Sequence, residues 1–208
     1  MIGIERRYVR YIRDYCEGTL AQVQQARQVE TGRSLGFAKV LDQRRQSVCV
    51  GTLFALVELG HQIDLPDHAF EDDDVRRVEL LGIEITLLHN DLLSYCKEET
   101  ERVPHNTVIA CRLEGMGAQE AVSFVANEAY QRMAEIDIVV SQLEQKQCNY
   151  RNELLQYLEG ILDVTKANLY WSLESGRFFS DAQKVQLKRD STIDVSRKIE
   201  IGAVAALS

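Results

Sequence analysis

The chain has 208 residues with 45% hydrophobic content and only 2 prolines and 12 glycines, which supports a real core and argues against an all-β or disordered chain. Its 24 basic and 32 acidic residues give a net charge of −8, which disfavours nucleic acid as a partner. No run of 18 apolar residues occurs, so no membrane span is expected.

Helical spacing of apolar residues dominates the chain and predicts an all-α fold. Glycines interrupt the pattern near residue 32, and Pro66 and Pro104 end two of its segments. No strand-like alternation with hairpin turns appears. The predicted helices begin with one that includes Tyr8 to Val23 and continue over about 37–61, 72–100, 105–115, 118–146 and 148–174.

These segments predict a bundle of about six or more helices with short connections. We expect residues 1–180 to form one helical domain. Residues 181–208 form a polar C-terminal tail that becomes weakly apolar at its end, and we assign it no secondary structure.

The cysteines and the N-terminal segment indicate in which cellular compartment the protein is expected. Five widely spaced cysteines without a CxxC pair indicate reduced thiols rather than a disulfide framework or a zinc site. The opening segment is charged throughout, unlike a signal peptide. We therefore expect a cytoplasmic protein.

The segment "NDLLSYCKE", residues 90–98, places three oxygen-bearing side chains on one helical face. Asn90, Ser94 and Glu98 are spaced by four residues, so successive side chains lie about 6 Å apart. Oxygen ligands of this kind suit Mg²⁺, particularly when a phosphorylated substrate completes the shell. An ordinary solvated polar face is the alternative, but the apolar run "VELLGIEITLLH" before the motif predicts a buried helix whose polar groups need partners.

The motif resembles the (N/D)D-x-x-S-x-x-x-E pattern of class I terpene synthases, in particular fungal and bacterial sesquiterpene cyclases. The resemblance implies that Asn90, Ser94 and Glu98 hold one Mg²⁺ ion and that Lys97 contacts diphosphate. It covers about residues 5–180 and corresponds to the C-terminal part of such a synthase.

Two further segments extend the resemblance. In "LDQRR", Arg44 stands 46 residues before Asn90, the family's interval for a diphosphate-sensing arginine. A planar guanidinium suits that role because it binds phosphate oxygens through two N–H groups. The chain departs from the family after this arginine, where "RRQSVCVG" delays the glycine to Gly51, so the register of the expected helix break stays open.

The second segment, "NLYWSLESGRFF", resembles the family's W-S-x-x-S-x-R-Y run. Arg177 matches the diphosphate-binding arginine, 79 residues after Glu98, and Phe178 replaces the tyrosine without its hydroxyl. Aromatic and apolar residues near the motifs are candidates for a cation-stabilising pocket. These are Phe54, Leu87 and Trp171, with plain core packing as the alternative for each.

One family feature is absent. No D-D-x-x-D/E motif precedes Arg44, and we interpret "EDDD" at 71–74 as a solvated helix N-terminus. The resemblance therefore implies that this chain alone makes little or no terpene. It also implies exposed apolar lining, which would favour association, for example as a homodimer.

The resemblance therefore implies a Mg²⁺-dependent terpene synthase, with a sesquiterpene as the expected product class, that ionises a prenyl diphosphate such as farnesyl diphosphate and cyclises the carbocation. By this resemblance Arg44, Lys97 and Arg177 would be catalytic and would bind the substrate diphosphate, and Phe178, Phe54 and Trp171 would contact the substrate. The alternative is a non-catalytic helical remnant or interaction protein of the same fold. A prenyltransferase is a weaker third hypothesis, because such enzymes use aspartate-rich motifs on both walls.

Overall fold

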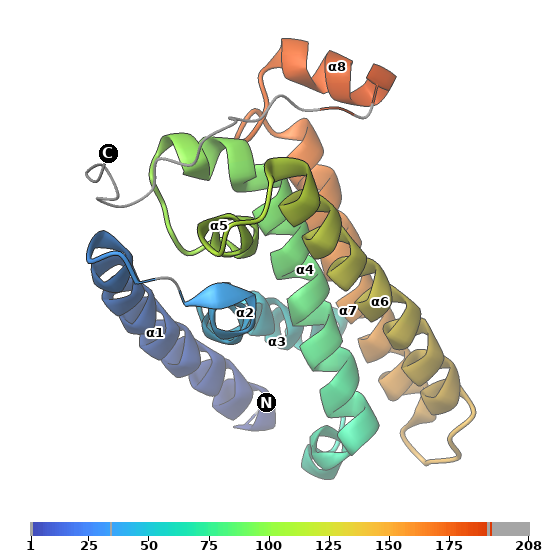
Figure 1. Ribbon diagram of the computed structural model, residues 1–208. Coiled ribbons are helices and arrows are strands. Elements are labelled where there is room, and N and C mark those ends of the chain that lie inside the picture. Colours follow the sequence, from blue (N-terminus) through green and yellow to red (C-terminus); the bar gives the residue numbers. More distant parts are fainter. Residues whose placement is uncertain (1, 34, 191, 193–208) are drawn as a thin grey trace, which may run out of the picture.

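A computed structural model describes residues 2–33, 35–190 and 192, and within these ranges the chain forms helices and no strand. This confirms the predicted all-α class (Figure 1). The elements in chain order are α1 (Ile2–Glu30), α2 (Gly36–Ser47), α3 (Val50–His61), the 3₁₀ helix η1 (Asp67–Glu71), α4 (Asp73–Thr100), α5 (Thr107–Leu113), α6 (Ala118–Glu144), α7 (Arg151–Glu174) and α8 (Asp181–Asp190).

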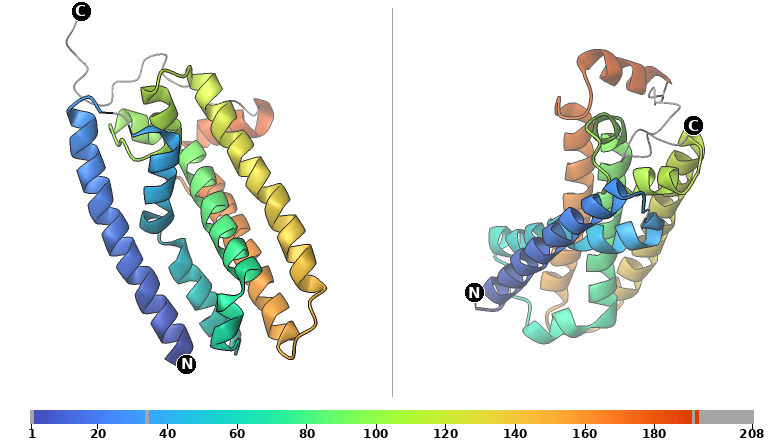
Figure 2. Two further views of the ribbon diagram at one scale, coloured as in Figure 1. Left: turned by 60° about the horizontal axis from the view of Figure 1, so that its bottom comes forward. Right: turned by 60° about the vertical axis from the view of Figure 1, so that its left-hand side comes forward.

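Helix α4 is the centre of the bundle. It packs against α6, α7, α5 and α2, whereas α1 lies at the edge of the molecule against α2 and α3 (Figures 1 and 2). Its N-terminal half contributes Val78 and Leu81 to one apolar cluster, and Leu87 and Leu88 belong to a second. Because α4 is covered on several sides, polar residues along it must find partners inside the protein or in a ligand.

The predicted helical region over 37–61 consists of two helices, and the break whose register the sequence left open lies between Ser47 of α2 and Val50 of α3. Cys49 adopts a left-handed conformation with φ 63°, which a helix cannot contain. The Thr52 hydroxyl donates a hydrogen bond to the Cys49 carbonyl at 2.6 Å and caps the turn. Gly51 lies inside α3, where a Cβ would meet the Tyr11 ring at 2.3 Å, so its role is to let α1 approach α3.

A buried polar cluster joins α1, α3, α4 and α7 near the N-terminal end of α4. We call it the basal cluster, and it contains Arg7, Tyr11, Glu58, Glu79 and Tyr157. Arg7 donates to Glu58 through Nε at 3.1 Å and through Nη2, and its guanidinium lies 3.7 Å from the centre of the Phe70 ring. Glu79 accepts hydrogen bonds from the hydroxyls of Tyr157 at 2.5 Å and Tyr11 at 3.3 Å.

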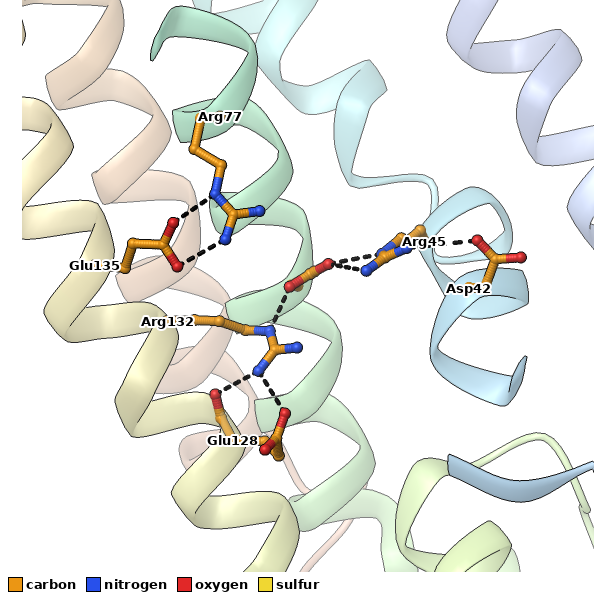
Figure 3. Close-up of polar contacts among 7 residues, drawn as sticks. Asp42, Arg45, Arg77, Glu128, Arg132 and Glu135 are labelled. Atoms are coloured by element: carbon orange, nitrogen blue, oxygen red, sulfur yellow. Dashed lines mark hydrogen bonds and ion pairs between the residues drawn. The ribbon is translucent and has the colours of Figure 1, made fainter. Parts of the chain in front are cut away.

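A second charged network ties α2 and α6 to the middle of α4 (Figure 3). Glu84 of α4 is 2% exposed and accepts from Arg45 of α2 at 2.6 Å and from Arg132 of α6. Arg132 also donates to Glu128 at 2.8 Å. The network fixes α2 relative to α4, and it thereby fixes the position of Arg44, the residue before Arg45.

The C-terminal tail is partly helical. We assigned no structure to residues 181–208, yet Asp181–Asp190 forms α8, a polar helix with no buried residue. Residues 191 and 193–208 lie outside the described part of the chain. Among the described helices, none combines the length and apolar character that crossing a membrane requires.

Candidate functional site

The predicted metal motif lies in the C-terminal third of α4, where the helix is largely enclosed. Ser94 and Asp91 are fully buried, and Asn90 and Glu98 are half-buried. The spacing of four residues places Asn90, Ser94 and Glu98 along one stripe of the helix. The stripe is therefore not the solvated face that was the alternative interpretation.

Arg44 reaches this stripe from α2. Its Nη2 donates to Asn90 Oδ1 at 3.2 Å and forms a close ion pair with Asp91 Oδ1. Arg44 is 8% exposed, and its Nε is buried without a hydrogen-bond partner. A buried guanidinium N–H without an acceptor is costly, so an anionic ligand at this position would complete it.

Asn106, the N-cap of α5, closes the other side of the motif. Its Nδ2 donates to Glu98 Oε2 at 2.9 Å and to the Asp91 carbonyl at 2.8 Å, and lies 3.4 Å from Ser94 Oγ. The Asp91 carboxylate accepts from the Thr107 backbone N–H at 2.8 Å. We call Arg44, Asn90, Asp91, Ser94, Glu98 and Asn106 the motif cluster.

The electrostatics of the cluster oppose a free carboxylate at Glu98. Burial, reinforced by the nearby Asp91 carboxylate, raises the pKa of Glu98, while the Asn106 hydrogen bond and Arg44 lower it. Burial also lowers the pKa of His105, next to Asn106. A cation beside Glu98 would favour its ionised form.

The donors of the cluster suit a hard cation. Asn90 offers an amide oxygen, Ser94 a hydroxyl and Glu98 a carboxylate, which are ligands that Mg²⁺ accepts when a phosphate and water complete its shell. The described residues contain no group of three or more His, Cys, Asp and Glu that could hold a metal by themselves. The residues therefore fit a cation shared with a ligand better than a closed protein site.

Two of the predicted diphosphate contacts are not drawn into the cluster. Lys97 Nζ pairs with Glu101 Oε2 at 2.7 Å on the surface. Arg177 is exposed, and its guanidinium lies 6.0 Å from the Trp171 ring centre and 5.6 Å from that of Phe178. The end of α7, which precedes Arg177, lies at the same end of the bundle as the end of α4 (Figure 1).

An apolar pocket of about 560 Å³ opens between α3 and α7. Trp171 is one of the residues that line it. Phe54 and Leu87 are fully buried core residues, so the plain-core alternative holds for both. The α3 residues on the pocket wall are instead Leu53, Leu56, Val57, Gly60 and His61.

Sequence reasoning missed Asp91 and Asn106. Asp91 lies within the quoted motif, but its burial and its contact with Arg44 depend on how α2 packs. Asn106 carried a local signal, because asparagine before an apolar helical segment and shortly after a proline is a typical N-cap. The link from that cap to Glu98 depends on how the loop between α4 and α5 folds back.

The α-helical bundle and the oxygen-donor motif place the chain among all-α proteins, and the sequence comparison specifies the family. Residues 3–135 match the family described as terpene synthase family 2, C-terminal metal binding. The chain belongs to this family, and the resemblance seen in the motifs is confirmed.

Two of the relatives are fungal synthases. The chain is 31% identical over 199 residues to silphinene synthase of Penicillium patulum, covering 96% of this chain and 51% of that protein. It is 27% identical over 194 residues to cycloaraneosene synthase of Sordaria araneosa, covering 93% and 53%. The chain thus spans about half the length of these curated relatives.

Solved structures share the fold. An α-eudesmol synthase matches with a TM-score of 0.74 and 20% identity, over 85% of this chain and 57% of that one. A linalool/nerolidol synthase from Streptomyces clavuligerus matches with a TM-score of 0.72 and 20% identity, over 81% and 59%. At this identity the comparison supports the fold alone.

Proposed function

We propose that the chain forms the metal- and diphosphate-binding half of a Mg²⁺-dependent sesquiterpene synthase that acts on a prenyl diphosphate such as farnesyl diphosphate. One observation carries the proposal: Arg44 of α2 contacts Asn90 of the metal motif at 3.2 Å and keeps a buried N–H without an acceptor. In a member of this family, a diphosphate oxygen is the natural acceptor for that group.

The proposed roles follow from the chemistry of each side chain. Asn90, Ser94 and Glu98 would hold Mg²⁺, which when bound neutralises charge on the leaving diphosphate. Arg44 would bind diphosphate oxygens from its buried position. Lys97 would have to leave a surface ion pair with Glu101, which costs little because exposed pairs contribute about 0–1 kcal/mol.

The residues at the end of α7 and just after it would contact the substrate outside the motif cluster; these are Trp171, Arg177 and Phe178. Arg177 is exposed next to the two aromatic rings, so its charge is accessible to a diphosphate. Trp171 lines the apolar pocket, where an aromatic face stabilises positive charge on the hydrocarbon after ionisation. The apolar residues of α3 and α7 would form one wall of the surface that the hydrocarbon contacts.

Calorimetry with Mg²⁺ and inorganic diphosphate tests the metal site. We expect wild-type chain to bind diphosphate in a Mg²⁺-dependent manner, and Glu98→Gln or Asn90→Ala to lose that dependence. Glu101→Gln, which changes the exposed partner of Lys97, serves as the matched control and should retain binding. Unchanged binding in both motif variants would contradict the assignment.

We further infer that this chain makes little or no terpene by itself, since it lacks an aspartate-rich motif before Arg44. Gas chromatography after incubation with farnesyl diphosphate measures the product. Binding of Mg²⁺ and diphosphate without turnover is the expected result, and robust turnover would contradict it. Sizing chromatography of the same sample tests whether the chain forms a homodimer. A dimer that covers the exposed leucines of α3 would bury apolar surface and is therefore expected.

A further inference from the structure

Asn106 caps α5 and also contacts the metal motif, which capping alone does not require. Its Oδ1 accepts from the backbone N–H groups of Val108 at 2.8 Å and Ile109 at 3.3 Å, which is the capping interaction for α5. Serine, threonine and aspartate cap a helix about as well through one side-chain oxygen. The cap alone therefore does not account for an amide at this position.

The amide nitrogen accounts for it. Asn106 is fully buried, and its Nδ2 lies within hydrogen-bond distance of the Glu98 carboxylate, the Asp91 carbonyl and the Ser94 hydroxyl. Among the preferred cap residues, only asparagine offers N–H donors from the group that caps. One side chain thus joins the start of α5 to two of the three proposed metal ligands.

We propose that Asn106 is a positioning residue that holds Glu98 and Ser94 in place for the metal and couples the metal site to the start of α5. This inference rests on the proposed function of the motif. Glu98 has a long side chain that would otherwise sample several rotamers, and one fixed carboxylate oxygen lowers the entropy lost when a cation binds. Thr107 strengthens the coupling, because its backbone N–H donates to the Asp91 carboxylate at 2.8 Å.

Asn106→Ser separates the two roles of the side chain. Serine keeps an oxygen for the α5 cap but has no amide to donate to Glu98. We expect the affinity for Mn²⁺ in the presence of inorganic diphosphate to fall about 10- to 100-fold, as removal of groups that orient metal ligands typically causes. Titration followed by the electron paramagnetic resonance signal of free Mn²⁺ measures it.

One control and one further variant test whether folding explains a loss of affinity. Asp72→Ala removes the cap at the other end of α4, where Asp72 accepts from the Asp74 backbone N–H at 3.0 Å, and should leave Mn²⁺ affinity unchanged. Asn106→Thr, which also keeps a capping oxygen, provides a second variant if the serine chain melts early. Circular dichroism should show wild-type helicity in the chains used for titration.

A double variant distinguishes positioning from general loosening of the fold. If Asn106 acts through the Glu98 charge, Asn106→Ser added to Glu98→Gln should weaken Mn²⁺ binding no more than about twofold further, because contacting residues are not additive. Losses that multiply, or wild-type affinity in Asn106→Ser, would overturn the inference while leaving the metal site intact. Wild-type chain that binds no Mn²⁺ with diphosphate would contradict the proposed function itself.

Discussion

Two buried polar clusters lie along α4, and they differ in how completely the protein satisfies them. In the basal cluster, Arg7 donates to both carboxylate oxygens of Glu58, and two tyrosine hydroxyls donate to Glu79. In the motif cluster, Arg44 Nε is buried without a partner, as are the neighbouring His105 Nδ1 and Thr107 Oγ1. The charged groups of the basal cluster are paired within the protein and hold helices together, whereas the unpaired Arg44 N–H leaves the motif cluster with capacity for a ligand.

Breaking the basal cluster should have the largest effect on stability. Arg7→Ala leaves the Glu58 carboxylate, which is 1% exposed, without its cation, and we expect a loss of about 3–5 kcal/mol in the free energy of unfolding. Chemical denaturation measures this loss. Replacing the pair together, as Arg7→Met with Glu58→Leu, should restore much of it, and a loss below about 1 kcal/mol in Arg7→Ala would contradict the structural role.

Arg44→Lys sharpens the comparison at the motif end. Lysine keeps the positive charge beside Asp91 but loses the planar fork, so we expect diphosphate affinity to fall about 10- to 100-fold, the equivalent of one charged hydrogen bond. Arg45→Lys is the matched control, because Arg45 pairs with Glu84 in the network of Figure 3 and not with the motif. Equal losses in the two variants would argue against a specific role for Arg44.

The pH dependence of stability tests how the basal cluster holds Glu79. Burial raises the pKa of Glu79, so the native state retains a proton that the unfolded chain has already lost. Stability from this group is therefore full below the ordinary glutamate pKa and falls as pH rises through the raised value. Glu79→Gln should flatten this decline in a pH series of unfolding experiments.

Glu135 provides a control of opposite sign. Its hydrogen bonds with Arg77 at 2.6 Å lower the pKa of Glu135, so its contribution is present above the ordinary pKa and is lost as pH falls. Glu135→Gln should therefore remove a small stabilisation at neutral pH.

For the Glu79→Gln variant, a free energy of unfolding that declines more steeply with rising pH than in the wild-type chain would contradict the role of Glu79 in the basal cluster.

The smallest expected effect concerns the break between α2 and α3. Cys49 has φ 63°, a conformation that glycine adopts without steric cost. Cys49→Gly should stabilise the chain by up to about 1 kcal/mol or leave it unchanged, because relief of strain is partly offset by backbone entropy. A loss above about 1 kcal/mol in thermal unfolding would mean that the Cys49 side chain contributes packing that outweighs the strain.

The sequence predicted the helical class and singled out Arg44 and Asn90, because helical spacing, the 46-residue interval and the metal motif are features of the chain itself. The contact between the two side chains came from the structure. The sequence missed the left-handed turn at Cys49, since cysteine has no preference for that conformation. It named Phe54 as a candidate pocket residue, whereas Leu53 and Leu56 line the pocket, because the rotation of α3 about its axis depends on tertiary packing. That packing buries Glu58 against Arg7 and exposes the leucines, the reverse of the usual amphipathic pattern.

The most direct test of the metal site is anomalous diffraction from crystals of the chain grown with Mn²⁺ and inorganic diphosphate. We expect one Mn²⁺ peak within coordination distance of Asn90 Oδ1, Ser94 Oγ and Glu98, with a diphosphate oxygen on Arg44. A Mn²⁺ peak elsewhere, or a motif that still binds diphosphate through Arg44 with no metal beside Glu98, would contradict it.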